Sequence, residues 1–311
     1  MRDQLVERVK SVLRPMVRHR TLIERAKFIG TPILDPQSGN DRIAELLVEG
    51  KPKALGKMGA SELGGLRRFE GGKDPTGICR SWGSHRGRLN LNAGVYPEDD
   101  AALSRFCQSY SRTLGELDLL AVWFHRGERQ LVTNFAAQAT LVSLTALEPF
   151  YHQRPWSQHL SGKRVLVVSP FSETIKSQYV RREQVWRSRP EVLPTFELDT
   201  LRCPLSAMLV KPAFPDWFTA LEAMQQEMSR RSFDVLLVGA GAWSLALAAH
   251  AKREGKWAIH LGGPLQLLFG IRGGRWDNHP FLQTVYNEAW VRPSPADRPE
   301  TFTKIENGCY W

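Results

Sequence analysis

Apolar runs along this chain repeatedly end in glycine, serine or charged residues, and these run ends are where the sequence offers chemistry. Four such loops stand out: Lys57 to Glu62, Ser169 to Ser172, Gly239 to Ser244 and His260 to Gly263. Glycine lets a backbone approach a bound anion closely. A glutamate or a histidine can move a proton, and a lysine can neutralise a phosphate. The chemistry of the protein is therefore expected at these loops.

The loop from Gly239 to Ser244 reads GxGxxS after a strand-like run, which imitates the fingerprint of dinucleotide-binding proteins. That fingerprint also needs an acid about 20 residues further on to hold the ribose. Here the stretch Ile259 to Leu261 offers none, so NAD is not expected as a cofactor. Phosphate binding by Gly239, Gly241 and Ser244 stays open, and so does the alternative of glycines that serve only a tight strand-to-helix turn.

The loop from Lys57 to Glu62 places a lysine at a strand end and a glutamate at the opening of a helix. The helix dipole stabilises an ionised glutamate there by about 0.3 to 1 kcal/mol, so a purely structural Glu62 is one interpretation. The other is a carboxylate at the mouth of a ligand crevice, serving a metal or a substrate hydroxyl. His260, at the end of the last strand-like run, is expected to touch the donor or to act as a base, and a structural hydrogen-bonding group is the alternative.

Two segments carry a resemblance to a known family. The segment Gly56-Lys57-Met58-Gly59-Ala60-Ser61-Glu62-Leu63 resembles the RFGDGE-type segment of bacterial glycosyltransferases with the GT-D fold. The run from Val235 to Phe269 is similar to their closing βαβ unit, with an apolar strand, a GA-rich turn, a helix, a second strand and a GG-containing turn. A looser likeness extends through Lys163 to Phe171, so the resemblance covers roughly two thirds of the chain.

The resemblance implies a hexosyltransferase-like enzyme that moves a sugar from a nucleotide-sugar donor to a glycan, glycoprotein or lipid-linked acceptor in bacterial surface-polysaccharide or glycoconjugate assembly. It implies that Glu62 and His260 act at the reacting centre. The residues expected to hold the donor are Lys57, Gly59, Ser169, Gly239, Gly241, Ser244 and Gly262. The alternative is a non-catalytic nucleotide-binding or scaffolding protein that kept the fold, and Ala60 favours it.

Metal dependence is the point at which this chain departs from the family. The family's DxE pair becomes Ala60-Ser61-Glu62, so the glutamate is kept and the aspartate is lost. Mg²⁺ or Mn²⁺ would depend on Glu62, since such an ion can be held by one or two carboxylates plus substrate phosphates. The leaving diphosphate could instead be neutralised by cations and backbone amides. A second acid pair, Glu197 and Asp199, resembles the DxD metal clamp of other glycosyltransferases and ranks below Glu62.

The segment from Gly77 to Tyr96 mixes Gly, Arg, His and Asn without periodicity, which predicts a long polar loop. Its arginines, Arg80, Arg86 and Arg88, are expected to contact the acceptor or a phosphate. A solvated basic loop is the alternative. No helix-turn-helix, zinc-finger or RNP pattern accompanies the segment, so nucleic acid is not expected as a partner.

The elements that must position these loops follow from the alternation of apolar runs with amphipathic segments, which predicts a mostly parallel, Rossmann-like α/β sheet with helices on both faces. Such sheets bind ligands beyond the carboxyl ends of their strands, where the four loops lie. We expect strands at Ala54–Lys57, Leu119–Phe124, Val165–Ser169, Thr195–Leu198, Val235–Val238 and Trp257–Leu261. We expect helices at Asp41–Leu47, Glu173–Arg187, Asp216–Arg230 and Ser244–Arg253.

Composition agrees with a globular protein. The 311 residues are 42% hydrophobic and 24% charged, which excludes disordered and collagen-like chains. The net charge of +10 favours a polyanionic partner. Residues 1–45 are expected to form an N-terminal helical segment and residues 46–311 a GT-D-like catalytic domain, with an internal junction near 158–163. Four scattered cysteines predict reduced thiols: Cys79, Cys107, Cys203 and Cys309.

Residues 2–18 place apolar side chains at helical spacing with Arg8, Lys10, Arg14 and Arg18 among the other positions, which predicts a basic amphipathic helix. This helix either packs on the protein or on a dimer mate, or it docks on an anionic membrane surface. The same stretch carries charge throughout and has no apolar core of a secretory signal, so a secretory signal is not expected. The chain is therefore expected in the bacterial cytoplasm, at the inner face of the membrane if the helix docks there.

Overall fold

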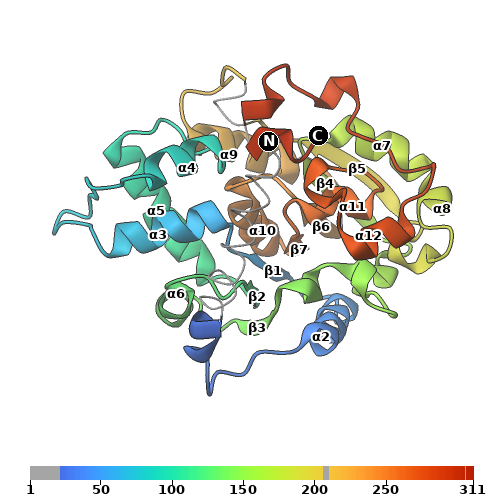
Figure 1. Cartoon of the computed structure of the whole chain (residues 1–311), viewed down its shortest axis with the longest axis horizontal. Coiled ribbons are helices and arrows are strands. Elements are labelled where there is room, and N and C mark those ends of the chain that lie inside the picture. The colour runs from blue at the N-terminus through green and yellow to red at the C-terminus, as the bar shows by residue number, and fades with distance from the viewer. Residues whose placement is uncertain (1–21, 206–209, 305) are drawn as a thin grey trace, which may run out of the picture.

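A computed structural model of the chain describes residues 22–205, 210–304 and 306–311 and shows one parallel sheet between two layers of helices (Figure 1). The seven strands lie in the order β3-β2-β1-β7-β6-β4-β5, and every neighbouring pair is parallel. The predicted fold class is thus confirmed. The strands are β1 (Lys53–Lys57), β2 (Leu119–Val122), β3 (Thr140–Ser143), β4 (Arg164–Ser169), β5 (Glu197–Arg202), β6 (Val235–Val238) and β7 (Trp257–His260).

The helices cover both faces of the sheet. On one face α3, α5, α9 and α10 share a buried cluster with alternate strand residues such as Ala54 and Leu236. On the other face α2, α7 and α11 share a second cluster with the intervening residues, such as Leu55 and Leu237. Successive side chains of each strand therefore point into two separate hydrophobic cores, as expected for a sheet buried on both sides.

The α-helices are α2 (Pro36–Val48), α3 (Ala60–Glu70), α4 (His85–Leu91), α5 (Asp100–Leu114), α6 (Glu128–Phe135), α7 (Ser172–Val180), α8 (Arg182–Val185), α9 (Trp217–Ser229), α10 (Trp243–Arg253), α11 (Pro264–Leu268) and α12 (Pro280–Val285). Short 3₁₀ turns join them at Leu144–Leu147, Pro149–Tyr151, Trp156–Leu160, Pro190–Val192, Gly274–Trp276, Pro295–Asp297, Phe302–Lys304 and Glu306–Gly308. No helix within the described ranges is long and apolar enough to cross a bilayer.

Several sequence predictions need correction. The fourth expected strand, Thr195–Leu198, begins at Glu197 in the structure and runs on to Arg202, while the short strand β3 was not predicted at all. The helix expected over Glu173–Arg187 is divided into α7 and α8 at Arg181. The polar loop expected from Gly77 to Tyr96 contains α4, because Leu89 and Asn90 are buried against the body of the protein.

The domain predictions fare differently along the chain. The expected boundary between the N-terminal segment and the catalytic domain, at residues 45 and 46, lies within α2. This division of the chain stays a prediction. The expected junction at 158–163 leads from a 3₁₀ turn into β4, and the segments on either side contribute strands to one continuous sheet. The basic amphipathic helix expected at residues 2–18 lies outside the described residues. All four cysteines are free thiols.

Candidate functional site

A cavity of about 490 Å³ opens at the carboxyl ends of the strands. Residues at or after the end of every strand line it, as the topology of a parallel sheet leads one to expect. The chain's last described segment closes one side of it. The lining from the strand ends includes Lys57, Glu62, Trp123, Glu148, Ser169, Cys203, Gly239, Gly241, His260 and Gly262, and the C-terminal part adds Arg275, Trp276, Glu306, Tyr310 and Trp311.

The structure brings most of the predicted site residues together in this cavity. Its lining contains the predicted residues Lys57, Gly59, Glu62, Ser169, Gly239, Gly241, His260 and Gly262. The side chain of Ser244 does not line the cavity, because it is fully buried and its hydroxyl accepts a hydrogen bond from the Ala240 amide at 2.8 Å. Ser244 therefore holds the turn in shape rather than facing a ligand.

The three predicted arginines lie away from the cavity. Arg80 is exposed and lies 3.7 Å from a carboxylate oxygen of Asp74. Arg86 pairs with Asp100, and Arg88 is exposed on α4. Their segment still reaches the cavity through Asn92, Ala93 and Gly94, which follow α4. These three arginines therefore lie away from Glu62 and His260, the residues predicted at the reacting centre.

Glu62 is the third residue of α3, and its carboxylate folds back over the start of its own helix. A Cβ placed on Gly59 would lie 2.1 Å from Oε2 of Glu62, so only glycine leaves room for this position. The side chain is 7% exposed. Burial raises the pKa of Glu62 to about 7, against a smaller opposing effect of its own backbone amide. Close to neutral pH this carboxyl can therefore both give and accept a proton.

His260 ends β7 and is also buried in the cavity wall. Its Nδ1 lies 3.3 Å from the carbonyl oxygen of Val238, which can only accept, so we assign the ring proton to Nδ1. Burial, reinforced by the positive charge of Lys57, lowers the pKa of His260 to about 3. Such an imidazole is a poor base at neutral pH, so of the two predicted catalytic residues Glu62 is better suited to accept a proton.

Lys57 ends β1, which lies between β2 and β7 in the sheet. Its Nζ lies 5.0 Å from the ring centroid of Trp123, which follows β2. On the other side its Cε would lie 3.3 Å from a Cβ on Gly262, a residue with φ of +66° in the turn after β7. Burial lowers the pKa of Lys57, with the Glu148 carboxyl opposing this effect and Arg275 adding to it. The lysine is thus a confined cation between two neighbouring strand ends.

The GxGxxS turn after β6 is tied to the protein by its own amides. Gly239 donates to Val168 O at 2.9 Å, Ala240 donates to the Ser244 hydroxyl, and Ala242 donates to Ala93 O at 3.1 Å. The amides of Trp243 and Ser244 bond within the turn. The glycines therefore serve close packing here, because a Cβ on Gly239 would lie 2.7 Å from Gly262 O. This geometry favours the structural alternative for the motif.

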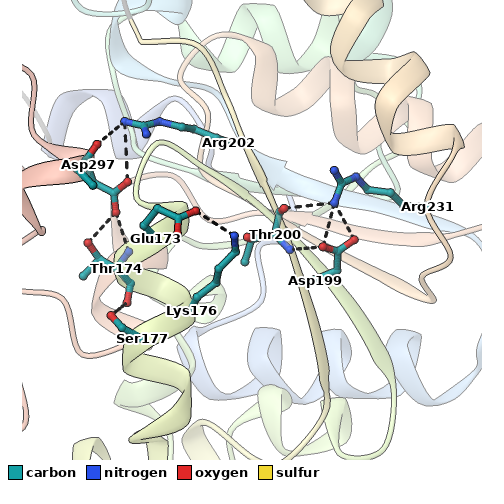
Figure 2. Close-up of polar contacts among 10 residues, drawn as sticks. Glu173, Thr174, Lys176, Ser177, Asp199, Thr200, Arg202, Arg231 and Asp297 are labelled. Carbon is teal, nitrogen blue, oxygen red and sulfur yellow. Dashed lines mark hydrogen bonds and ion pairs between the residues drawn. The ribbon is translucent and has the colours of Figure 1, made fainter.

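The helix start after β4 is also occupied. Oδ2 of Asp297 accepts hydrogen bonds from the amide and the hydroxyl of Thr174 in the first turn of α7, each at 2.7 Å (Figure 2). Asp297 is fully buried. Because a carboxylate already sits where the helix dipole attracts an anion, this terminus is satisfied by the protein itself.

The second acid pair does not form a metal clamp. Glu197 and Asp199 lie at the amino end of β5, so they are at the opposite edge of the sheet from the cavity. Asp199 pairs with Arg231 at 2.8 Å, as Figure 2 shows. The expectation depended on a strand ending at Leu198, whereas the strand in the structure begins at Glu197 and runs on to Arg202.

A divalent cation finds a poor ligand set in this cavity. Ala60 supplies no oxygen beside Glu62, and Glu306 is already paired with Arg275. Within the part of the chain that the structure describes, no three His, Cys, Asp or Glu side chains are grouped to hold a metal. Lys57 in the same wall adds a positive charge that opposes a second cation. The residues present therefore do not fit Mg²⁺ or Mn²⁺.

Sequence reasoning missed several lining residues. Trp123 and Glu148 follow strand ends, and the polar residues after β2 and β3 were the signal that could have drawn attention to them. Arg275 and Tyr310 come from beyond the last strand, and nothing in their local sequence marks them. They reach the cavity because Gln266 donates to Tyr310 O at 3.1 Å and Arg275 N donates to Cys309 O at 2.9 Å.

The loop that carries Trp123 depends on a buried acid, and this gives a testable prediction. The Glu128 carboxylate accepts from the amide of Trp123 at 3.1 Å and from the amide of His125 at 2.9 Å. Between these residues Phe124 has φ of +60°, a conformation that needs support. Replacing Glu128 by alanine should lower the free energy of unfolding by about 2 kcal/mol, because two amides lose their acceptor.

Urea unfolding of both proteins checks this expectation. Glu128→Gln keeps one carbonyl acceptor and should lose clearly less stability than Glu128→Ala. Equal stability of the alanine variant and the parent would show that the loop holds its shape without this carboxylate.

No protein-family model matches this chain, and no curated protein is similar to it at a significant level. Two solved structures resemble its fold. One is a selenomethionine-substituted structure of domain of unknown function 1792 (DUF1792), with a TM-score of 0.44, 13% identity, and coverage of 78% of this chain and 81% of that chain. The other is described as showing that this domain has a distinct glycosyltransferase fold, with a TM-score of 0.42, 14% identity, and coverage of 77% and 82%.

Proposed function

We propose that the protein is a hexosyltransferase-like enzyme that binds a nucleotide-sugar donor in the cavity at the strand ends. It transfers the sugar to a glycan, glycoprotein or lipid-linked acceptor in bacterial surface-polysaccharide or glycoconjugate assembly. The observation that carries the proposal is the buried Glu62 carboxyl in the cavity wall, with a pKa of about 7. The expected place of the reaction stays the bacterial cytoplasm or the inner face of the membrane.

The proposed reaction uses Glu62 as the base. The acceptor oxygen forms a bond to the anomeric carbon of the sugar while the bond from that carbon to the diphosphate oxygen breaks. The acceptor proton passes to Glu62, and the nucleoside diphosphate leaves with the bonding electron pair. A carboxyl with a pKa near the working pH is well matched to this proton transfer.

The rest of the cavity suits the rings of such a donor. Trp123, Trp276 and Tyr310 line it together, and aromatic faces pack well on sugars and nucleobases. The volume of about 490 Å³ is within the range of small-molecule sites. These features support a nucleotide sugar over a small ion as the ligand.

A non-catalytic nucleotide-binding or scaffolding protein is the second candidate, and one observation favours it. Ala60 lines the cavity at the position where the resemblance leads one to expect an aspartate. Incubation with a donor and a candidate acceptor distinguishes the two: binding without any release of nucleoside diphosphate supports the second candidate.

Nucleotide choice gives a prediction that needs no variant. UDP or a UDP-sugar should stabilise the protein against heat, while NAD should not, because Ile259 and Leu261 are apolar and buried at the end of β7 and supply no ribose-binding acid. A ligand at a hundred times its Kd adds about 2.7 kcal/mol. Thermal-shift curves with a panel of nucleoside diphosphates, their sugars and NAD make the comparison. A larger shift with NAD than with any nucleotide sugar would contradict the assignment.

A further inference from the structure

The buried lysine at the end of β1 lacks a polar partner in the protein. Lys57 is 5% exposed, and no hydrogen bond or ion pair joins its ammonium to another described residue. Its ammonium lies over the face of Trp123 instead, 5.0 Å from the ring centroid. Holding a cation in a protein wall without hydrogen bonds is costly, so such a group points to an anionic ligand that supplies the missing acceptors.

The other positive features of the cavity are already used. Arg275 pairs with Glu306 and packs on the ring of Tyr310 at 4.6 Å. His260 has lost its charge to burial, which lowers its pKa to about 3. In the turn that opens α10 and in the first turn of α7, backbone amides already donate hydrogen bonds to acceptors of the protein, as described above. Among the described cations of the lining, Lys57 is the one left without an anionic partner.

The surroundings of Lys57 also leave room for oxygen atoms close to its ammonium. Gly262 faces it without a side chain, since a Cβ there would lie 3.8 Å from Nζ. The Glu148 carboxyl lies in the same lining, where burial raises its pKa and the charge of Lys57 opposes this effect. A phosphate can therefore approach between the turn after β7 and Trp123.

We propose that this cavity binds the diphosphate of its ligand through the Lys57 ammonium and without a divalent cation. The inference rests on the proposed function, because that function supplies the diphosphate. When the bond to the sugar breaks, negative charge develops on the departing phosphate oxygen, and the fixed ammonium neutralises it. On this proposal the Lys57 ammonium supplies the positive charge that a metal ion would otherwise supply. An aspartate at position 60 is then not needed to hold a metal.

Calorimetric titration with inorganic pyrophosphate and with UDP, in buffer with EDTA, tests the proposal on the full chain. Both probes should bind in EDTA, and a parallel titration of UDP in buffer with Mg²⁺ and without EDTA should give nearly the same affinity. Lys57→Met keeps the length of the side chain and removes the charge, so it should weaken both probes by about 10- to 100-fold. Lys51→Met removes the same charge from an exposed site just before β1 and should have no effect.

The outcomes separate the inference from the function on which it rests. UDP binding that needs Mg²⁺ or Mn²⁺ would overturn the inference and leave the glycosyltransferase proposal standing. Unchanged affinity of Lys57→Met in EDTA would do the same. If neither UDP nor any nucleotide sugar binds under any condition, the proposed function itself falls.

A second measurement covers the case in which Lys57→Met does not fold. Acetic anhydride acylates free amines, and mass spectrometry reports the modification of each lysine in the unaltered protein. Pyrophosphate in EDTA should slow the acylation of Lys57 at least severalfold and leave that of Lys51 unchanged. Equal rates at Lys57 with and without pyrophosphate would overturn the inference.

Discussion

Replacing Glu62 by glutamine should lower turnover by about two to four orders of magnitude, the range found for acid–base residues. Glutamine has nearly the same shape, so it should keep the position over Gly59 and the packing of α3, while it cannot accept the acceptor's proton. Nucleotide affinity should change little, since the proposed anion contact belongs to Lys57. Release of nucleoside diphosphate from a donor that the thermal-shift panel identifies measures the effect.

Gly59→Ala is a second way to test the same carboxyl. Its φ of -70° suits alanine, but the new Cβ would lie 2.1 Å from Oε2 of Glu62 and would push the carboxylate aside. Activity should therefore fall while the fold is kept. Full turnover in a folded Glu62→Gln protein would refute the catalytic role and leave Glu62 as a residue that stabilises the start of its helix.

The pH dependence of activity and of stability should differ in sign. As a base, Glu62 must be ionised, so activity should rise with pH through its pKa of about 7. In the unfolded chain its pKa is near 4.5, so between these two values the folded protein binds more protons than the unfolded one. The contribution of Glu62 to stability therefore falls as pH rises from about 4.5 to about 7, by up to about 3 kcal/mol. Glu62→Gln should remove this part of the pH dependence.

The strand ends were predictable because the burial pattern of parallel strands is strong. Lys57, Glu62 and His260 lie at or just after apolar runs, so locating the runs placed all three at one edge of the sheet. The environment of each side chain was beyond prediction. The sequence did not show that burial would raise the pKa of Glu62 to about 7 and lower that of His260 to about 3. An exposed histidine is a stronger base than an exposed glutamate, whereas here Glu62 is the stronger base of the two.

The errors have local physical causes. Arg80 to Arg88 looked like a ligand loop because charge and glycine are common in loops, but burial of Leu89 and Asn90 folds the second half of the segment, from His85, into α4. The turn after β6 looked like a phosphate cradle because glycines permit one, yet the Ser244 hydroxyl takes the Ala240 amide. A motif gives the shape of a turn, and tertiary contacts decide whether its donors remain for a ligand.

Replacing Asp297 by alanine should lower the free energy of unfolding by about 3 kcal/mol. The fully buried carboxylate accepts from the amide and hydroxyl of Thr174, and its charge sits at the positive end of α7 (Figure 2). Charged hydrogen bonds contribute about 1.5 to 3 kcal/mol each, and a buried charge at a helix terminus adds up to about 2 kcal/mol, offset by the desolvation of the carboxylate. Urea unfolding measures the difference.

Two matched variants show whether the loss belongs to this buried contact. Asp297→Asn keeps an oxygen that can accept from Thr174, so it should lose less than Asp297→Ala. Glu173→Gln removes a carboxylate from the same turn of α7, but this one is half exposed and paired with Lys176 at 2.9 Å, so the change should stay within about 0.5 kcal/mol. Because α7 begins directly after the cavity residues Ser169 to Phe171, loss of its anchor should also weaken nucleotide binding. An alanine variant as stable as the parent would mean that α7 is held by its apolar face alone.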